Sequence, residues 1–404
     1  MYCEKILPEI IQKNDRKILL VVLDGLGGLP DQATGRTELE TARIPNLDQL
    51  ARDASTGLMS PVAAGITPGS GPAHLGLFGY DPVEYQIGRG ILECLGIGMH
   101  VDRDDLAIRG NFATIDDRKI VTDRRAGRIP TEENSRLVEA IGKQIPEIRG
   151  VKIDIRTVKE HRCAILLRGK NLAPQVTEND PQKEGLPLGQ LAPHEDSAAF
   201  TAQVLTEFED RVQAVLKPLK SKANALLLRG FSKLPHIPTF EEKYGLKPAC
   251  IATYPMYKGL SKLVGMDILQ TGDTLEDEIA TLRREYERYD FFYLHIKKTD
   301  AMGEDGNFAG KVQALEYIDS KIMKTRELDF EAVVVTGDHS TPARLKGHSW
   351  HPVPFMLLSP NALPDTVTRF TERECSRGIL GLFHSTEAIY LMLASALKLQ
   401  KFGA

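Results

Sequence analysis

We predict an α/β fold in which a three-layer α/β/α domain is interrupted by an inserted, smaller α+β domain. Strands buried on both faces of a parallel sheet are nearly continuous apolar runs. Four segments have that character: KILLVVLDG (17–25), FFYLHIK (291–297), AVVVTG (332–337) and VPFMLLS (353–359). Besides these apolar runs, two further observations support the prediction. Helical patterns separate the later runs, and the middle of the chain has shorter and more mixed apolar segments.

The helical patterns lie between the later strands. Over residues 275–289 the apolar residues fall on one face of a helix, and Thr274 with Asp277 resembles a capping box at its start. Residues 311–323 repeat the amphipathic pattern. Strands that alternate with helices favour a sheet with helices on both faces.

The middle of the chain, residues 106–235, contains shorter apolar runs and the polar stretch TENDPQKEGLPLGQLAPHED. The candidate ligands described below come from both sides of this segment. We therefore expect one discontinuous catalytic domain, residues 1–105 with 236–404, and an inserted substrate-binding domain at 106–235. Three tandem domains would place Asp24 and Asp300 in separate cores.

Composition excludes several classes of protein. A formal net charge of -4 over 404 residues provides no general basic field, so nucleic acid is not an expected partner. The five cysteines are scattered without a CxxC pair, which fits a reducing cytoplasm better than a disulfide framework. No apolar stretch is long enough to cross a membrane, and the N-terminal segment does not have the pattern of a secretory signal.

Two positions near the N-terminus are candidates for chemistry. Asp24 ends the first strand, where a carboxylate points into the crevice in which α/β proteins bind ligands; the alternative is a simple Asp-Gly turn. Ser70 lies in PGSGPAHLGLF, where Gly69 and Gly71 permit a sharp turn into a helix. Unpaired N–H groups at a helix N-terminus favour phosphate, although Ser70 could serve only as an N-cap.

Carboxylates and histidines recur in the C-terminal half. Asp300 and Glu304 are four residues apart, so one helical turn would place both on one face. Asp338 and His339 follow a strand, and His348 comes nine residues after His339. Together with Asp24 and Ser70, these side chains suit two divalent ions about 3.5–4 Å apart.

The sequence resembles the archaeal-type cofactor-independent phosphoglycerate mutases of the alkaline phosphatase superfamily. The resemblance covers nearly the whole chain, and its motifs are VVLDGLGGLP, PGSGPAHLGLFGYDP, RGNFATIDD, TDRRAGRI, ENDP, HIKKTDAMG, TGDHSTP, HSWHPVPF and KFGA. It implies an alkaline-phosphatase-like catalytic domain that interconverts 3-phosphoglycerate and 2-phosphoglycerate through a phosphoserine. Mn²⁺ is the metal we expect, with Mg²⁺ and Zn²⁺ as alternatives.

The resemblance also implies roles for individual residues. Asp24, Ser70, Asp338 and His339 would bind one metal ion, with Ser70 as the nucleophile, whereas Asp300 and His348 would bind the second. The inserted domain would hold the glycerate so that water cannot intercept the phosphoserine. The basic residues that could bind the carboxylate and phosphate of the substrate are Arg124, Arg125, Arg128, His161, Arg162 and Lys258, and Asp180 is also expected at the substrate site.

Three departures from the family pattern lie near the expected site. Glu304 stands where the family has a histidine ligand, so Glu304 or Asp305 could complete a weaker second metal site. Gly71-Pro72 replaces the Asp-Thr that often follows the serine, and Gln182 replaces a histidine. These departures leave open a related phosphotransferase of the homoserine-kinase kind or a phosphomonoesterase, and the oligomeric state is also left open.

Overall fold

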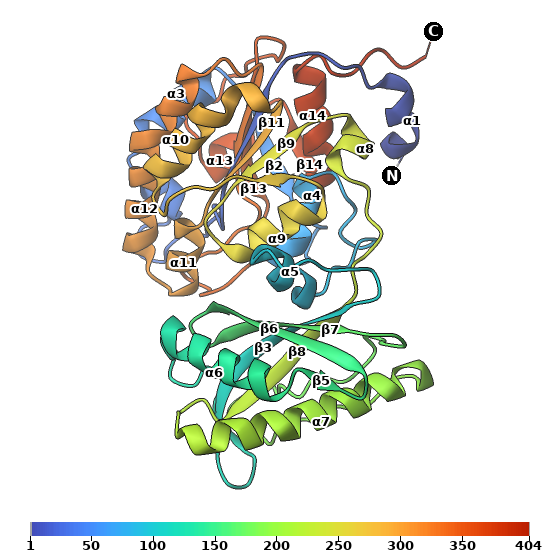
Figure 1. The fold of residues 1–404 in the computed structure, drawn as a ribbon. Coiled ribbons are helices and arrows are strands. Elements are labelled where there is room, and N and C mark those ends of the chain that lie inside the picture. Colours follow the sequence, from blue (N-terminus) through green and yellow to red (C-terminus); the bar gives the residue numbers. More distant parts are fainter. Residues whose placement is uncertain (1, 404) are drawn as a thin grey trace. The chain divides into compact units, whose positions relative to one another are not determined.

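The computed structural model describes residues 2–403 and divides them into two compact units (Figure 1). Unit 1 comprises residues 1–86 and 237–404, and unit 2 comprises residues 87–236. The chain thus leaves unit 1 once, forms unit 2, and returns. The second boundary lies beside the position expected from the sequence, whereas the first lies at 87 rather than 106.

Unit 1 is built on an eight-stranded sheet with the strand order β10-β9-β11-β1-β12-β13-β2-β14. Its strands are β1 (Ile18–Leu23), β2 (Ser55–Ser60), β9 (Pro248–Ile251), β10 (Asp267–Ile268), β11 (Phe291–Ile296), β12 (Ala332–Thr336), β13 (Val353–Leu358) and β14 (Gly381–His384). Its helices are α1 (Tyr2–Ile10), α2 (Glu38–Thr41), α3 (Pro45–Arg52), α4 (Ser70–Leu77), α8 (Phe240–Tyr244), α9 (Pro255–Leu263), α10 (Leu275–Glu285), α11 (Lys298–Glu304), α12 (Phe308–Ile322), α13 (Glu372–Cys375) and α14 (Ala388–Ser395).

Helices cover both faces of this sheet. Figure 1 shows α3, α10 and α12 on one face and α4, α9 and α14 on the other. The central strands β1, β11 and β12 are buried along their whole length, as their apolar sequences require. The predicted three-layer arrangement and the capping box of Thr274 with Asp277 are confirmed.

One strand runs against the others. β13 pairs antiparallel with both β12 and β2, whereas the remaining neighbours in the sheet are parallel. The prediction that residues 353–359 behave like a strand of a parallel sheet is therefore wrong in direction. An apolar run indicates that a strand is buried on both faces of the sheet, but it does not indicate the direction of the strand.

The parallel register brings the candidate residues to one edge. Leu23 of β1 lies opposite Ile296 of β11, and Val22 lies opposite Thr336 of β12. Asp24, Asp300 and Asp338 follow the carboxyl ends of these three neighbouring strands. Their approach is therefore a consequence of strand register, which supports the crevice expected from the sequence.

Unit 2 is an α+β unit with an antiparallel sheet. Its strands are β3 (Leu106–Ile115), β4 (Val121–Asp123), β5 (Glu147–Ile148), β6 (Val151–Lys159), β7 (Arg162–Arg168) and β8 (Ala225–Ser232). Its helices are α5 (Arg89–Gly96), α6 (Thr131–Gln144) and α7 (Ala199–Leu216). Leu137 of α6 and Phe208 of α7 join Ile165 of β7 in one hydrophobic core.

The early boundary of unit 2 has a local cause in α5. The Gly90 position has no room for a side chain, since a Cβ atom there would lie 2.4 Å from the carbonyl oxygen of Ala107. The backbone N–H of Ile91 donates to Ser232 Oγ at 3.2 Å. Residues 87–105, which we had assigned to the catalytic domain, thus belong to unit 2, where α5 packs on β3 and β8.

Candidate metal centre

Four side chains of unit 1 meet around Ser70. The Oγ atom of Ser70 lies 3.3 Å from His339 Nε2, and that nitrogen lies 3.1 Å from Asp338 Oδ2 and 3.6 Å from Asp24 Oδ1. Asp24, Asp338 and His339 are fully buried. The structure therefore brings together the four residues for which the sequence predicted a first metal site.

A second group shares His339. Asp300, His339 and His348 each offer a ligand atom within 4.8 Å of the others. His348 Nε2 lies 3.6 Å from Asp300 Oδ1, and the rings of His339 and His348 stack with centroids 3.7 Å apart. Two adjacent ligand groups suit a two-ion centre, in which the single Nε2 lone pair of His339 would bind one of the two ions.

Glu304 stands at the margin of the second group. Asp300 and Glu304 lie on α11, as their spacing predicted, and Glu304 Oε1 lies 3.8 Å from His348 Nε2. The Glu304 side chain is 55% exposed, in contrast to the buried Asp300. Glu304 is thus close enough to reach an ion through a small side-chain movement, but it is not part of either compact group.

Hydrogen bonds at the Nδ1 atoms of His339 and His348 fix the orientation and the tautomer of the two imidazole rings. His348 Nδ1 lies 2.9 Å from the carbonyl oxygen of Pro68, which can only accept, so Nδ1 carries the proton. His339 Nδ1 lies 3.0 Å from Thr341 Oγ1, whose own hydrogen is donated to Asp300 Oδ1 at 2.7 Å. Both Nε2 lone pairs are therefore free, which is the usual state of metal-binding histidines.

The chemistry of the donors fits divalent ions. Among the described residues, Asp24 Oδ1 and Asp338 Oδ2 are buried without a hydrogen-bond partner. A bare buried carboxylate oxygen is costly, and a bound cation would satisfy it. Carboxylates combined with neutral imidazoles suit Mn²⁺, Mg²⁺ or Zn²⁺.

The pKa values of Asp24 and Asp338 are shifted in opposite directions. Burial and the negative charge of Asp24 raise the pKa of Asp338 well above its usual value. Burial alone would also raise the pKa of Asp24, but the ammonium group of Lys297 and the imidazole of His295 outweigh it and lower that pKa. Burial also lowers the pKa of His339, which keeps the imidazole neutral and available as a ligand.

Several residues of the centre were missed by sequence reasoning. The Lys297 ammonium lies 3.0 Å from Asp24 Oδ2 and also pairs with Asp300, while His295 Nε2 lies 3.2 Å from Asp24 Oδ2. The Tyr257 hydroxyl donates to Asp24, and His74 Nδ1 lies 3.3 Å from Asp338 Oδ2. A polar residue inside an otherwise apolar strand, as in FFYLHIK, was the available signal for His295.

Ser70 occupies the first turn of α4. Gly69 is the N-cap residue, so Ser70 is the first helical residue and not the N-cap. The first backbone bond of this turn runs from Ala73 N to the Gly69 carbonyl at 3.1 Å. The N–H groups of Ser70 and Gly71 come before this first helical hydrogen bond, so they have no acceptor within the helix. At a helix N-terminus such N–H groups favour the binding of an anionic phosphoryl group.

Three of the predicted substrate residues of unit 2, Arg125, Arg128 and Arg162, lie near His161. This side chain is buried, and burial together with the charges of Arg162, Arg125, Arg109 and Arg128 lowers the pKa of His161 to about 4. Arg125 and Arg128 are exposed, and among the described residues neither guanidinium group has a hydrogen-bond or ion-pair partner. The cluster is therefore a concentration of positive charge suited to a small anion.

Asp180 has a different role within this region. Its buried carboxylate accepts two bonds from Arg124, at 2.9 and 2.7 Å, and a third from Arg229 at 3.1 Å. The N–H of Gln182 also donates to it at 3.0 Å. Asp180 thus orients two arginines, and its oxygens are already engaged.

Lys258 lies apart from the other predicted substrate residues, on α9 of unit 1. It is half-buried and directly follows Tyr257. Burial of Glu278 raises the pKa of its carboxyl group to about 8, and the positive charge of Lys258 opposes this rise. The ammonium group of Lys258 therefore lies near Glu278 of α10.

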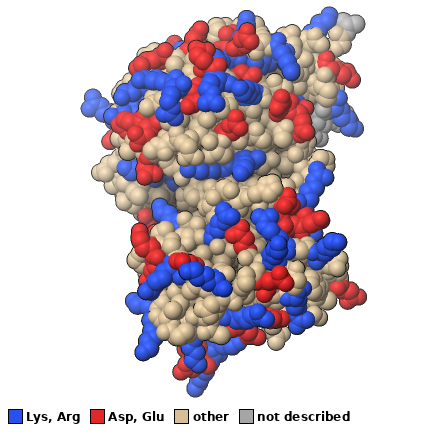
Figure 2. Space-filling model, viewed as in Figure 1, with Lys and Arg blue, Asp and Glu red and all other residues tan. Residues whose placement is uncertain are grey.

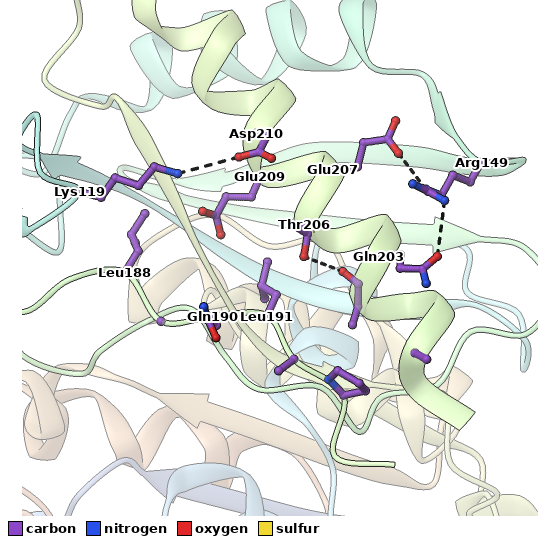
Figure 3. A pocket seen from close by; sticks show the side chains of 15 residues that line it. Lys119, Arg149, Leu188, Gln190, Leu191, Gln203, Thr206, Glu207, Glu209 and Asp210 are labelled. Atoms are coloured by element: carbon purple, nitrogen blue, oxygen red, sulfur yellow. Dashed lines mark hydrogen bonds and ion pairs between the residues drawn. The ribbon is translucent and has the colours of Figure 1, made fainter. Parts of the chain in front are cut away.

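A separate cavity of about 910 Å³ lies on unit 2 (Figure 3). It is lined by α7 and residues 188–193, with Lys119 and Arg149 at its sides. Those two cations are paired with acidic residues of α7, Lys119 Nζ with Asp210 Oδ1 at 3.9 Å and Arg149 Nε with Glu207 Oε2 at 2.8 Å. The cavity contains none of the predicted site residues.

The surface charge is mixed. On the face shown in Figure 2, basic and acidic side chains are interspersed, as the small net charge requires. Within residues 2–403, no helix combines the length and apolar character needed to span a bilayer.

Known proteins share this chain's sequence and fold. Residues 51–220 match the model of the family described as "2,3-bisphosphoglycerate-independent phosphoglycerate mutase". A protein of Aquifex aeolicus named "Probable 2,3-bisphosphoglycerate-independent phosphoglycerate mutase" is 52% identical over 99% of this chain and 100% of its own length. A protein of the same name from Thermus thermophilus is 50% identical over 99% of each chain.

Solved structures agree with these matches. The structure titled "Cofactor-Independent Phosphoglycerate mutase from Thermoplasma Acidophilum" is 31% identical, covers 94% of this chain and 100% of its own, and superposes with a TM-score of 0.71. The PH0037 protein from Pyrococcus horikoshii is 30% identical over 96% of this chain and 99% of its own, with a TM-score of 0.82. The chain therefore belongs to the 2,3-bisphosphoglycerate-independent phosphoglycerate mutase family.

Proposed function

We propose that this protein interconverts 3-phosphoglycerate and 2-phosphoglycerate in the cytoplasm, with Ser70 as the transient phosphoryl carrier. The observation that carries this proposal is the convergence of Ser70 with Asp24, Asp338 and His339 beside the second group around His348. Family membership supports the same reaction. Four cysteines among the described residues, Cys94, Cys163, Cys250 and Cys375, are buried and unpaired, which is consistent with a reducing compartment.

We assign the first ion to Asp24, Ser70, Asp338 and His339, and the second to Asp300 and His348, with Mn²⁺ as the preferred metal. Bound divalent ions would neutralise phosphoryl oxygens and lower the pKa of the Ser70 hydroxyl. The free Nε2 atoms and bare carboxylate oxygens described above are the donors for these ions.

The reaction requires two phosphoryl transfers at Ser70. In the first, the Ser70 oxygen loses its proton and bonds to phosphorus, while the bond from phosphorus to the C3 oxygen of the substrate breaks and that oxygen takes a proton. The glycerate then reorients. In the second, its C2 oxygen loses a proton and bonds to phosphorus, while the bond to Ser70 breaks and the Ser70 oxygen takes a proton back. The N-terminal N–H groups of α4 face the charge that develops on the transferred group.

We assign the retention of the glycerate to the cationic cluster of unit 2. Arg125 and Arg128 have exposed guanidinium groups without partners among the described residues, so they are free to bind the carboxylate of the acceptor. Asp180 orients Arg124 and Arg229 in the same unit. Neutral His161 adds a hydrogen-bonding group without increasing the positive charge.

A coupled assay tests the proposed function. Protein stripped of metal and resupplied with Mn²⁺ should convert 3-phosphoglycerate to 2-phosphoglycerate without added 2,3-bisphosphoglycerate. Turnover that depends on Mn²⁺ but not on bisphosphoglycerate is the expected result. Absence of turnover while Mn²⁺ remains bound would contradict the mutase assignment and direct attention to another phosphate acceptor.

Replacing Glu304 with alanine should weaken the second ion without eliminating the first. Because Glu304 is exposed and lies only near His348, we expect the Mn²⁺ concentration for half-maximal activity to rise about 3- to 10-fold. Titration of mutase activity against Mn²⁺ measures this shift. The control is Glu287→Ala, at an exposed glutamate of unit 1 outside both ligand groups, which should leave the activation curve unchanged. An unchanged activation curve for Glu304→Ala as well would make Glu304 a bystander.

Replacing Arg125 with alanine should impair substrate binding but leave metal binding intact. Loss of a bidentate contact to carboxylate should lower kcat/KM about 10- to 100-fold, chiefly through KM. Steady-state kinetics and Mn²⁺ titration check the two parts separately. Arg103→Ala, also an exposed arginine of unit 2, should have wild-type kinetics, and equal kinetics for both variants would remove Arg125 from the site.

A further inference from the structure

A buried lysine lies behind the metal centre and takes no part in the chemistry proposed above. Lys311, on α12, is completely buried. Its Nζ atom donates to three backbone carbonyls, those of Gly25 at 2.8 Å, Gly27 at 2.9 Å and Thr341 at 2.9 Å. An ammonium group has three N–H donors, so all of them are used.

The three carbonyls belong to the two segments that carry the expected ligands of the first ion. Gly25 and Gly27 follow Asp24 at the end of β1, whereas Thr341 follows Asp338 and His339 after β12. The segments are in close contact, since a Cβ atom at Gly25 would lie 2.5 Å from Thr341 Oγ1. Lys311 therefore joins two loops that are more than 300 residues apart in sequence.

Thr341 extends this connection to both ion sites. Its carbonyl accepts from Lys311, while its hydroxyl donates to Asp300 Oδ1 at 2.7 Å and accepts from His339 Nδ1 at 3.0 Å. One residue held by Lys311 thus orients an aspartate of the second group and the imidazole that the two groups share. A displacement of Thr341 would move donors of both sites together.

The buried Glu38 and the half-buried Glu372 accept hydrogen bonds from backbone N–H groups of the same two loops. Glu38 Oε1 accepts from Ala343 N at 2.7 Å, and Glu372 Oε1 accepts from Gly28 N at 2.9 Å. Burial lowers the pKa of Lys311, and the charges of Glu38 and Glu372 oppose that effect. The ammonium group is thus compensated by carboxylates and carbonyls, as a buried charge requires.

We propose that Lys311 is a positioning residue that sets the geometry of both metal sites by clamping the loops after Asp24 and His339. This inference rests on the proposed two-ion function. Lys311 contacts backbone behind the ligands, so it acts on metal affinity through Thr341 and the two loops. Loss of partners that orient metal ligands typically costs 10- to 100-fold in affinity, about 1.4 to 2.7 kcal/mol.

Mn²⁺ binding by the full-length protein tests this role. Calorimetric titration of metal-stripped protein should show at least about 10-fold weaker Mn²⁺ binding for Lys311→Met, with kcat approaching that of the wild type at saturating Mn²⁺. The matched control is Lys398→Met. Lys398 is also buried, with Nζ donating to the Asn14 carbonyl at 2.8 Å, but it lies at the C-terminal end of unit 1 and bonds none of the metal-site loops. Both variants should lower the melting temperature, but only Lys311→Met should lower metal affinity.

A second pair of variants applies if Lys311→Met does not fold. Thr341→Val removes the bridging hydroxyl at nearly constant volume, and Thr325→Val removes another buried hydroxyl, one that donates to the Ile322 carbonyl at 2.8 Å. We expect weaker Mn²⁺ binding only for Thr341→Val. Unchanged Mn²⁺ affinity in Lys311→Met would overturn the inference but not the proposed function. If Lys311→Met does not fold, unchanged Mn²⁺ affinity in Thr341→Val would overturn the inference in the same way. Failure of the wild-type protein to bind Mn²⁺ would instead overturn the proposed function itself.

Discussion

Ser70→Ala should abolish mutase activity while leaving the fold and Mn²⁺ binding largely intact. The Ser70 oxygen is the atom that we expect to bond to phosphorus in both transfers, and no other hydroxyl can replace an enzyme nucleophile at its position. We expect kcat to fall by at least about 10⁴-fold. The folded state should change little, because the described contacts of this hydroxyl are limited to a 3.3 Å approach to His339 Nε2 and a hydrogen bond with the Tyr257 side chain.

Three measurements separate these effects. The coupled assay gives kcat, calorimetry gives Mn²⁺ affinity, and mass spectrometry after brief exposure to 3-phosphoglycerate detects a phosphorylated peptide in the wild type only. Ser320→Ala is the control, since Ser320 lies on the exposed face of α12 and bonds only the Tyr317 carbonyl. Mutase turnover retained by Ser70→Ala would exclude Ser70 as the nucleophile.

Asp338→Asn should eliminate the first metal site and, without metal, should not destabilise the protein. Asp338 Oδ2 is buried and bare, and the negative charge of Asp24 contributes to the raised pKa of Asp338. The neutral amide retains the shape of the side chain and removes the repulsion between these carboxyl groups. Activity should fall by at least about 10³-fold, because a charged metal ligand is lost.

Thermal unfolding with and without Mn²⁺ distinguishes this effect from general damage. A ligand at 100 times its Kd stabilises the folded state by about 2.7 kcal/mol, so the wild type should melt at a higher temperature with Mn²⁺. Asp338→Asn should show a much smaller rise. Asp319→Asn is a matched control: Asp319 is buried and accepts from Leu47 N at 2.7 Å, so its variant should be less stable without metal but should keep the Mn²⁺ response. A full Mn²⁺ response in Asp338→Asn would remove Asp338 from the ligand set.

The residues missed by sequence reasoning differ in kind from those it found. Asp24, Asp300 and Asp338 could be selected because each follows an apolar strand, and Ser70 because glycines flank it before a helix. His295 and Lys297 belong to the same motif as Asp300 but lie within or directly after the apolar run, where burial gives no indication of what they face. Tyr257 comes from α9, a separate element whose contact with Asp24 depends on how that helix packs on the sheet.

The sequence by itself determined the α/β class, four strands of unit 1 (β1, β11, β12 and β13), the helices α4, α10 and α12, and the residues of the two candidate ligand groups. It could do so because periodicity and the ends of apolar runs are local properties. Tertiary structure decided the direction of β13, the attachment of α5 to unit 2, and the sharing of His339 between two ligand groups. Strand direction, helix packing and side-chain convergence depend on contacts between segments far apart in the chain. The clamp formed by Lys311 belongs to this second class, since a lysine within an amphipathic helix is normally expected to face solvent, and here its three partners come from distant loops.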